Sequence, residues 1–207
     1  MIAIVDYGMG NRRSVEKALH HVGAPATVTG DAATIRSADG IVVPGVGAFP
    51  AAMEALDRLG LTELLRERAG AGVPLLGICL GMQLLFERSS EHDGAPGLGL
   101  LRGDVTYLDP QGERLPHIGW NLVTRTRPAR LTAELGDVAF YHVHSLACRP
   151  SDPADVAATT TYGETFATIV ERDNVFGAQF HPEKSSRDGL ALLANFAAVS
   201  APVPSAT

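Results

Sequence analysis

Short, uninterrupted apolar segments recur through the first half of the chain, and segments with the 3.6-residue period of a helix separate them. Continuous apolar runs rich in β-branched residues are typical of strands that are buried on both faces. Strands that alternate with helices predict a parallel sheet covered by helices on both sides. The expected strands are residues 2–5, residues 41–43, which Pro44 ends, and residues 75–78.

Each helical segment has one apolar face. From Val15 to Val22 the apolar residues fall at i, i+3, i+4 and i+7, and Ser14 is placed to cap that helix. Pro50 suits the first turn of a second helix, and residues 61–65 continue the helical pattern. These segments are long enough to cover a sheet of short strands.

The second half of the chain has a different pattern. Residues 89–99 are rich in glycine, proline and charge and predict a surface loop. A polar turn at 172–174 predicts a hairpin, and the capping-box-like pattern of Ser185–Asp188 predicts the start of the last helix. Short β elements are expected within 104–123, and strands at 140–145, 166–170 and 175–180.

Together these patterns predict an α/β fold with a mostly parallel central sheet flanked by helices and an added β-rich portion in the second half. The length of 207 residues suits a single domain, expected over 1–200. The last residues, 201–207, are proline, alanine and small polar residues and are expected to form a disordered tail.

A candidate nucleophile lies at the end of the third expected strand. Cys79 is the centre of a Gly-x-Cys-x-Gly turn between that strand and a helical segment, the pattern of a nucleophile elbow with sulfur in place of oxygen. Gly77 and Gly81 suit a turn too tight for side chains. A thiol at the start of a helix favours the reactive thiolate form. The alternative is a small cysteine buried in the core.

A candidate base follows the last expected strand. His181 precedes Pro182, and Glu183 lies two residues after the histidine. A nucleophilic thiol needs a base within hydrogen-bonding reach, and the base needs a third group that fixes its tautomer. His181 and Glu183 supply both from one loop. A structural histidine is the alternative, but the cysteine elbow in the same chain favours catalysis.

Three segments together resemble the signature segments of the class I, triad-type glutamine amidotransferases: 44–47, 77–83 and 179–185. Three further segments, 4–11, 117–121 and 141–145, resemble the glutaminase subunits of imidazole glycerol phosphate synthases. The resemblance runs from the first residue to about Phe196. It implies a class I glutamine amidotransferase fold that hydrolyses L-glutamine through Cys79, His181 and Glu183. It also implies a cyclase partner with a (β/α)8 barrel, joined in a heterodimer, that receives the ammonia.

The resemblance also implies roles for residues that the patterns alone do not single out. The backbone N–H groups of Val46 and Leu80 are expected to form the oxyanion hole, which the two glycines beside Val46 would allow. Gly45, Gly47, Gln83 and Ser145 are expected to hold glutamine. Asn11, Trp120, Tyr141 and Lys184 are expected at the partner interface.

Composition excludes several other classes. The formal net charge of −6, without a basic block, argues against nucleic-acid binding. The longest uncharged run near the elbow, 73–86, is too short to cross a membrane, and no leader pattern precedes the first strand. Cys79 and Cys148 do not resemble a disulfide framework, so a reducing, cytoplasmic location is expected.

Neither a cofactor nor a metal is expected. Gly8-x-Gly10 resembles part of a dinucleotide fingerprint, but Arg13 stands where the third glycine would be. His142 and His144 share one face of a strand, but no third ligand has zinc-like spacing. The alternatives left open are a glutaminase of another synthase (anthranilate, aminodeoxychorismate or pyridoxal phosphate type), a cysteine hydrolase or esterase, and a scaffold with a vestigial triad.

Overall fold

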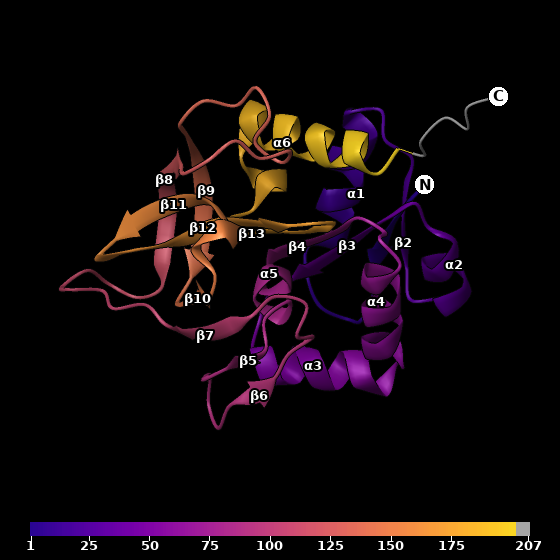
Figure 1. Cartoon of the computed structure of the whole chain (residues 1–207), viewed down its shortest axis with the longest axis horizontal. Coiled ribbons are helices and arrows are strands. Elements are labelled where there is room, and N and C mark those ends of the chain that lie inside the picture. Colours follow the sequence, from indigo (N-terminus) through magenta and orange to yellow (C-terminus); the bar gives the residue numbers. More distant parts are fainter. Residues whose placement is uncertain (202–207) are drawn as a thin grey trace.

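The computed structural model describes residues 1–201. Its central sheet begins with five strands that are all parallel, each hydrogen-bonded to the next (Figure 1). The predicted strands of the first half are confirmed within this set. In sheet order the five are β2 (Ala26–Thr29), β1 (Ile2–Val5), β3 (Gly40–Gly45), β4 (Leu75–Cys79) and β13 (Val175–Ala178).

Helices cover both faces of this parallel sheet (Figure 1). Alternation along each strand explains the two layers, because successive side chains of a strand point to opposite faces. Ala3 and Val5 pack with one set of helices, whereas Ile2 and Ile4 pack with the other. On the first face lie α2 (Ala32–Ser37), α3 (Phe49–Arg58) and α4 (Leu61–Gly70), and on the second lie α1 (Arg12–His21) and α6 (Ser186–Val199).

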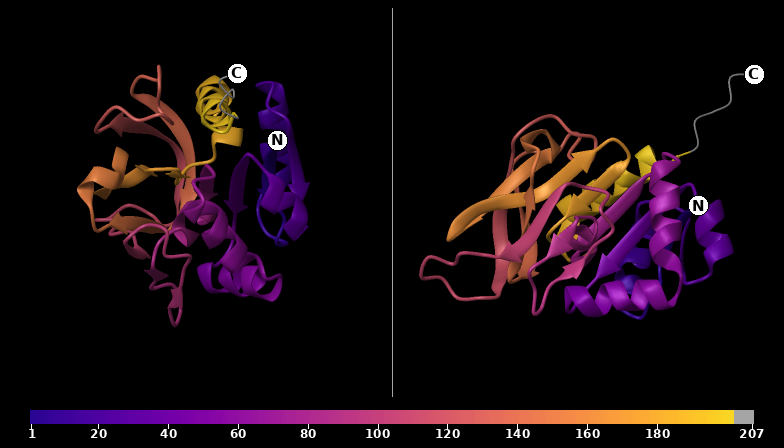
Figure 2. Two further views of the ribbon diagram at one scale, coloured as in Figure 1. Left: turned by 45° about the vertical axis from the view of Figure 1, so that its right-hand side comes forward. Right: turned by 60° about the horizontal axis from the view of Figure 1, so that its bottom comes forward.

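The second half adds antiparallel strands to one edge of the parallel sheet. Both views in Figure 2 show these strands projecting to one side of the helix-covered part. The predicted hairpin is confirmed, because β12 pairs antiparallel with β13 across the turn 172–174. The strands are β5 (Arg88–Ser89), β6 (Ala95–Pro96), β7 (Gly103–Tyr107), β8 (His117–Arg125), β9 (Val138–His144), β10 (Leu146–Pro150), β11 (Val156–Tyr162) and β12 (Glu164–Arg172).

The predicted fold class, a mostly parallel central sheet flanked by helices with an added β-rich portion, is confirmed. Apart from Ala201, the tail expected over 201–207 lies outside the described residues. Within the described residues, no helix combines the length and the apolar character that a membrane crossing requires.

Several local predictions were wrong. Pro44 does not end β3 but lies inside it, paired with Ile78 of β4. Because β1 pairs with β3 only as far as Val42, Pro44 has a neighbouring strand on one side only, where a residue without an N–H is tolerated. The first helix starts at Arg12, so Ser14 lies within it and Asn11 is the N-cap.

Residues 89–99 are also more ordered than a surface loop. They contribute to the short β5–β6 hairpin, and Leu98 is buried in the core beside α3 and α4. The composition of this segment did not reveal the hairpin, because short strands with few apolar residues leave little periodicity in the sequence.

Candidate active site

The turn around Cys79 has the tight geometry of a nucleophile elbow. Cys79 ends β4 and precedes α5 (Leu80–Leu84), with φ of 55° and ψ of −113°. Positive φ is unfavourable for a residue with a side chain, so the surrounding structure must hold this conformation. A Cβ on Gly81 would lie 1.7 Å from the carbonyl oxygen of Val43, and one on Gly77 would lie 2.4 Å from the carbonyl oxygen of Gly81.

The histidine and the carboxylate are fixed together on the segment that follows β13. His181 Nδ1 lies 2.9 Å from Glu183 Oε1, and the two side chains are only 3% and 1% exposed. Because Glu183 accepts the Nδ1 proton, the Nε2 atom of the ring is left to face a reacting group. Glu183 lies in the 3-10 helix η2 (Pro182–Lys184).

A second set of hydrogen bonds holds the His181 backbone on β9. The His181 N–H donates to the carbonyl oxygen of Tyr141 at 2.9 Å. The Ser185 hydroxyl donates to the carbonyl oxygen of His181 at 2.7 Å and accepts the Tyr141 N–H at 3.0 Å. The capping prediction for Ser185 was therefore wrong, since its side chain makes no cap hydrogen bond to α6 and holds the candidate base in place.

Cys79 and His181 line the same cavity, of about 270 Å³. Burial lowers the pKa of His181, but the interactions of the ring with Cys79 and Glu183 outweigh burial and raise that pKa to about 10. The thiol also lies 3.8 Å from the carbonyl oxygen of Val143 and 4.0 Å from Gln179 Nε2. We call these three groups the candidate catalytic row: the sulfur and the imidazole line the cavity, and the carboxylate is hydrogen-bonded to the imidazole.

Most of the residues that the sequence assigned to this site also line the cavity. Val46 and Gly47 line it from the segment after β3, Leu80 and Gln83 from α5, and Ser145 from the segment after β9. Gln83 is buried and donates to the carbonyl oxygen of Leu146 and to Gln179 Oε1. Gly45 does not line the cavity. Its backbone packs so closely against Tyr7 and Leu80 that a Cβ there would lie 2.7 Å from the tyrosine oxygen.

Two ionisable residues of the cavity wall were not assigned to the site by the sequence analysis. Glu91 contributes a carboxylate from the segment expected to be a surface loop, and its Oε2 accepts the Phe49 N–H at 2.6 Å. His144 contributes an imidazole from the end of β9. Glu91 carries no local pattern that separates it from the other charged residues of 89–99, so no signal marked it in advance.

His144 belongs to a buried cluster of histidine rings, in which it is hydrogen-bonded to His117. Its Nδ1 lies 2.7 Å from the carbonyl oxygen of Leu146, and its Nε2 lies 3.2 Å from Nδ1 of His117. Asn121 approaches Nε2 of His117 at 3.3 Å, so both nitrogens of each ring have partners. Burial lowers the pKa of His144 to about 3 and that of His142 to about 2, so these rings are neutral. This histidine cluster supports the cavity wall, and its hydrogen bonds leave no ring nitrogen of His117 or His144 free for a metal.

The residues expected at the partner interface come from four segments: β8, β9, η2 and the loop before α1. Trp120 on β8 is 55% exposed and pairs across the strands with Tyr141 on β9, ring edge to ring face. Lys184 is exposed at the cavity mouth. Asn11 is half-buried, and its amide donates to Glu183 Oε1 at 3.2 Å. Asn11 therefore contacts the candidate triad directly, which the sequence did not indicate.

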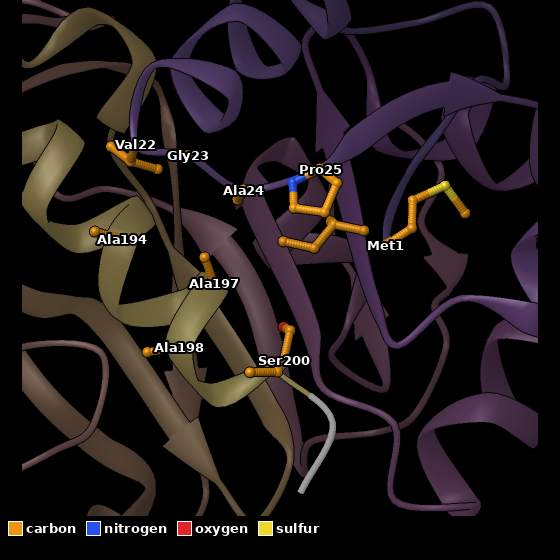
Figure 3. Close-up of a pocket in the computed structure, with 11 residues that line it drawn as sticks. Met1, Val22, Gly23, Ala24, Pro25, Ala194, Ala197, Ala198 and Ser200 are labelled. Carbon is orange, nitrogen blue, oxygen red and sulfur yellow. The ribbon is translucent and has the colours of Figure 1, made fainter. Parts of the chain in front are cut away.

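A second cavity, of about 340 Å³, lies on another part of the molecule (Figure 3). Its walls are Met1, the turn 22–25 and the short side chains of Ala194 and Ala197, with Ser200 as its one hydroxyl. Among residues 1–201, no acid, base or thiol side chain lines this cavity, so its described walls offer no catalytic group.

A model of the family described as "Glutamine amidotransferase class-I" matches residues 3–199 of the chain. A protein of Moorella thermoacetica called imidazole glycerol phosphate synthase subunit HisH is 52% identical, over 94% of this chain and 93% of the relative. Proteins of the same name from Bacillus cereus and Salinibacter ruber are 50% and 48% identical, each over 96% of this chain.

The chain belongs to the class I glutamine amidotransferases, among the HisH subunits of imidazole glycerol phosphate synthase.

Solved structures support the same fold at lower identity. A structure described as a glutamine amidotransferase has a TM-score of 0.76 and 20% identity, over 96% of this chain and all of that one. A structure of PurLQS from Thermotoga maritima has a TM-score of 0.70 and 19% identity, over 96% of this chain and 95% of that one. These similarities concern the fold alone.

Replacing Glu183 with glutamine is expected to lower the pKa of His181 in this class I glutamine amidotransferase, because the carboxylate is one of the two groups that raise it. A raised pKa stabilises the folded state fully below the unfolded value near 6.5, and the gain is lost as pH rises through the folded value of about 10. The variant should therefore lose about 2 kcal/mol of stability near neutral pH and less above pH 10.

The measurement is an NMR titration of the His181 ring together with unfolding curves at several pH values. Glu54→Gln, an exposed change on α3, is the control and should leave both unchanged. An unaltered His181 titration in Glu183→Gln would contradict the assigned contact.

Proposed function

We propose that this chain is the glutaminase subunit of an imidazole glycerol phosphate synthase and hydrolyses L-glutamine to glutamate and ammonia. The observation that carries the proposal is that Cys79 and His181, far apart in the sequence, line one cavity, while Glu183 is hydrogen-bonded to His181. The identity of about half of all residues with HisH subunits supports this particular synthase over the anthranilate and pyridoxal phosphate types.

The proposed reaction has two steps, formation and hydrolysis of a thioester, and Cys79, His181 and Glu183 take part in both. The Cys79 sulfur attacks the side-chain amide carbon of glutamine, and the N–H groups of Val46 and Leu80 stabilise the oxyanion. His181 carries the thiol proton to the leaving nitrogen, so ammonia departs and a glutamyl thioester remains. Water then gives a proton to His181 and attacks the thioester, which releases glutamate and restores the thiol. Glu183 holds the imidazole in the productive tautomer throughout.

The walls of the cavity suit an amino acid with a side-chain amide. The Glu91 carboxylate complements the α-ammonium group of glutamine, and Ser145 and the backbone at Gly47 offer polar groups for the rest of the substrate. Gln83 is proposed to help hold the substrate from the elbow side. Gly45 is proposed to act indirectly, by allowing the close packing of the strand before Val46.

The proposed partner is a cyclase subunit with a (β/α)8 barrel that forms a heterodimer with this chain. The face of β8 beside the cavity supports it, since Ile118, Trp120 and Leu122 are all more than half exposed. Tyr141 and Lys184 extend this surface to the cavity mouth. Ammonia released at Cys79 would pass to the cyclase, which completes imidazole glycerol phosphate and aminoimidazole carboxamide ribotide for histidine biosynthesis. Two free cysteines suit a cytoplasmic location.

An assay of substrate choice tests the function. The purified chain, alone and with its cyclase, is given glutamine, asparagine and simple esters, and the released acid is measured. We expect glutamine to be hydrolysed at least about 100-fold better than asparagine, which is one methylene shorter and places its amide away from Cys79. Ester hydrolysis without glutamine hydrolysis in the complex would favour a cysteine hydrolase instead.

A further inference from the structure

We propose that Asn11 is a positioning residue of the catalytic row, which acts by holding the Glu183 carboxylate in the orientation that His181 requires. This inference rests on the proposed function. The contact that carries it is the hydrogen bond from Asn11 Nδ2 to Glu183 Oε1, the same oxygen that accepts His181 Nδ1. Within residues 1–201, the Asn11 side chain makes no hydrogen bond to the Cys79 sulfur or the His181 imidazole, so its action on the reaction passes through Glu183.

The Asn11 side chain does not form the capping hydrogen bond that its position at the start of α1 allows. Asn11 is the N-cap of α1, where asparagine is among the preferred residues because its side chain accepts a free N–H of the first turn. Here the side chain makes no cap hydrogen bond, although the backbone oxygen accepts from Ser14 and Val15. The helix start thus fixes the backbone of Asn11, while the amide group points to Glu183.

Glu183 depends on this contact more than most carboxylates would. The side chain is 1% exposed, and within residues 1–201 no group donates a hydrogen bond to its Oε2 atom. A buried carboxylate with few hydrogen-bond donors is weakly held in its orientation, and few hydrogen bonds offset the free-energy cost of its burial. Asn11 and His181 are the two side chains that hydrogen-bond to Oε1, so the loss of Asn11 would leave the imidazole alone to orient the carboxylate.

The loop that carries Asn11 is itself anchored. Asp6 at the end of β1 pairs with Arg12 and accepts the Gly8 N–H. Gly10 has φ of 95°, and a Cβ there would lie 3.0 Å from the backbone of Pro44. The two glycines of the sequence motif thus have a role without any nucleotide. Gly10 lets the loop lie closely against β3, and Gly8 adopts a positive φ of 88° in the turn that leads to Asn11.

The test is Asn11→Asp, which keeps the shape and a good N-cap but replaces a donor by an acceptor. In the complex with the cyclase we expect kcat for glutamine hydrolysis to fall about 10- to 100-fold, the loss of one charge-assisted hydrogen bond. KM should change little, because Asn11 does not line the cavity. The melting temperature should fall, because an ionised carboxylate at this position lies beside the buried carboxylate of Glu183, and this loss should be smaller at low pH, where the new carboxyl group is protonated.

The pH profile separates positioning from a structural role. In Asn11→Asp, an ionised carboxylate at position 11 would repel Glu183, whereas a protonated one can donate as the amide does. The activity ratio of variant to wild type should therefore fall as pH rises. α1 packs against η2 here. α6 and β9 also pack against η2. The ionisable groups on all these elements and on the loop before α1 are Asp6, Tyr7, Arg12, Arg13, Glu16, Lys17, His20, His21, Tyr141, His142, His144, His181, Glu183, Lys184, Arg187 and Asp188.

Asn195→Asp is the matched control. The Asn195 amide donates to the carbonyl oxygens of Leu131 and Ala133, far from the cavity, so this variant should lose stability while its kcat and pH profile stay as in wild type. Wild-type kcat with a flat activity ratio in Asn11→Asp would overturn the inference. The proposed function would still stand if Cys79→Ala were inactive, so the two failures are distinguishable.

A spectroscopic measurement covers the case in which Asn11→Asp folds poorly. In Asn11→Ala, the NMR signal of the His181 Nδ1 proton should move upfield and exchange faster with water, since its acceptor is less firmly held. An unchanged signal in that variant would also count against the inference.

Discussion

Replacing Cys79 with alanine is expected to abolish glutamine-dependent synthesis by the complex, while added ammonium still supports the cyclase reaction. Removal of the nucleophile from a catalytic triad costs about 10⁶-fold in kcat. The change removes a single sulfur from a side chain that is 5% exposed, so the elbow and the partner surface should persist. Glutamate release and product formation are measured in parallel, with glutamine and with ammonium as the nitrogen source.

Cys148→Ala is the matched control for this experiment. Cys148 lies on β10, is 1% exposed and packs in the core of the first helix-covered face. Its loss should cost about 1 kcal/mol of stability and leave glutamine hydrolysis intact. Full glutamine-dependent activity in Cys79→Ala would remove the cysteine from the mechanism and the proposed function with it.

The parts of the fold that the sequence predicted are those with a strong local pattern. β4 and the elbow combine a continuous apolar run with two glycines, and α3 has both an apolar face and a proline in its first turn. β2 has intermediate burial at all four positions, and α2 is only six residues long, so neither has a clear period. Periodicity reports burial on one face, and elements without it were missed.

In the candidate site, too, the residues that the sequence predicted are those with a strong local pattern. Cys79, and His181 with Glu183, lie in compact motifs whose residue types already suggest their chemistry. The contacts of Glu91 and Asn11 could not be predicted, since each is made with a residue far away in the sequence. One sequence contains no record of such pairs.

Ser185 illustrates the opposite error, because a correct local pattern led to the wrong role. A serine at the start of a helix usually caps it. Here the hydroxyl hydrogen-bonds to His181 and Tyr141 instead, and α6 begins without a side-chain cap. Tertiary contacts of a polar side chain thus override its local preference at the site where the reaction is proposed to take place.

Replacing Gly81 with alanine is expected to have the largest effect on stability of any single methyl addition at the elbow. The new Cβ would lie 1.7 Å from the carbonyl oxygen of Val43, which belongs to the backbone of β3 and cannot rotate away. Either α5 or β3 must shift, and overpacking of this kind costs about 3 kcal/mol or more. Because α5 follows Cys79 directly, the shift would also move the thiol from His181, and glutamine hydrolysis should fall steeply.

Gly70→Ala separates this clash from the general effect of removing a glycine. Gly70 is exposed at the end of α4, and a Cβ there meets no atom within 4 Å. Alanine restricts the unfolded chain and favours the helix, so this variant should gain about 0.5 kcal/mol. Chemical unfolding of both variants, with glutaminase assays in the complex, gives the comparison. Equal stability of the two variants would mean that the elbow relaxes without strain, and that close packing at Gly81 does not hold Cys79 at its positive φ.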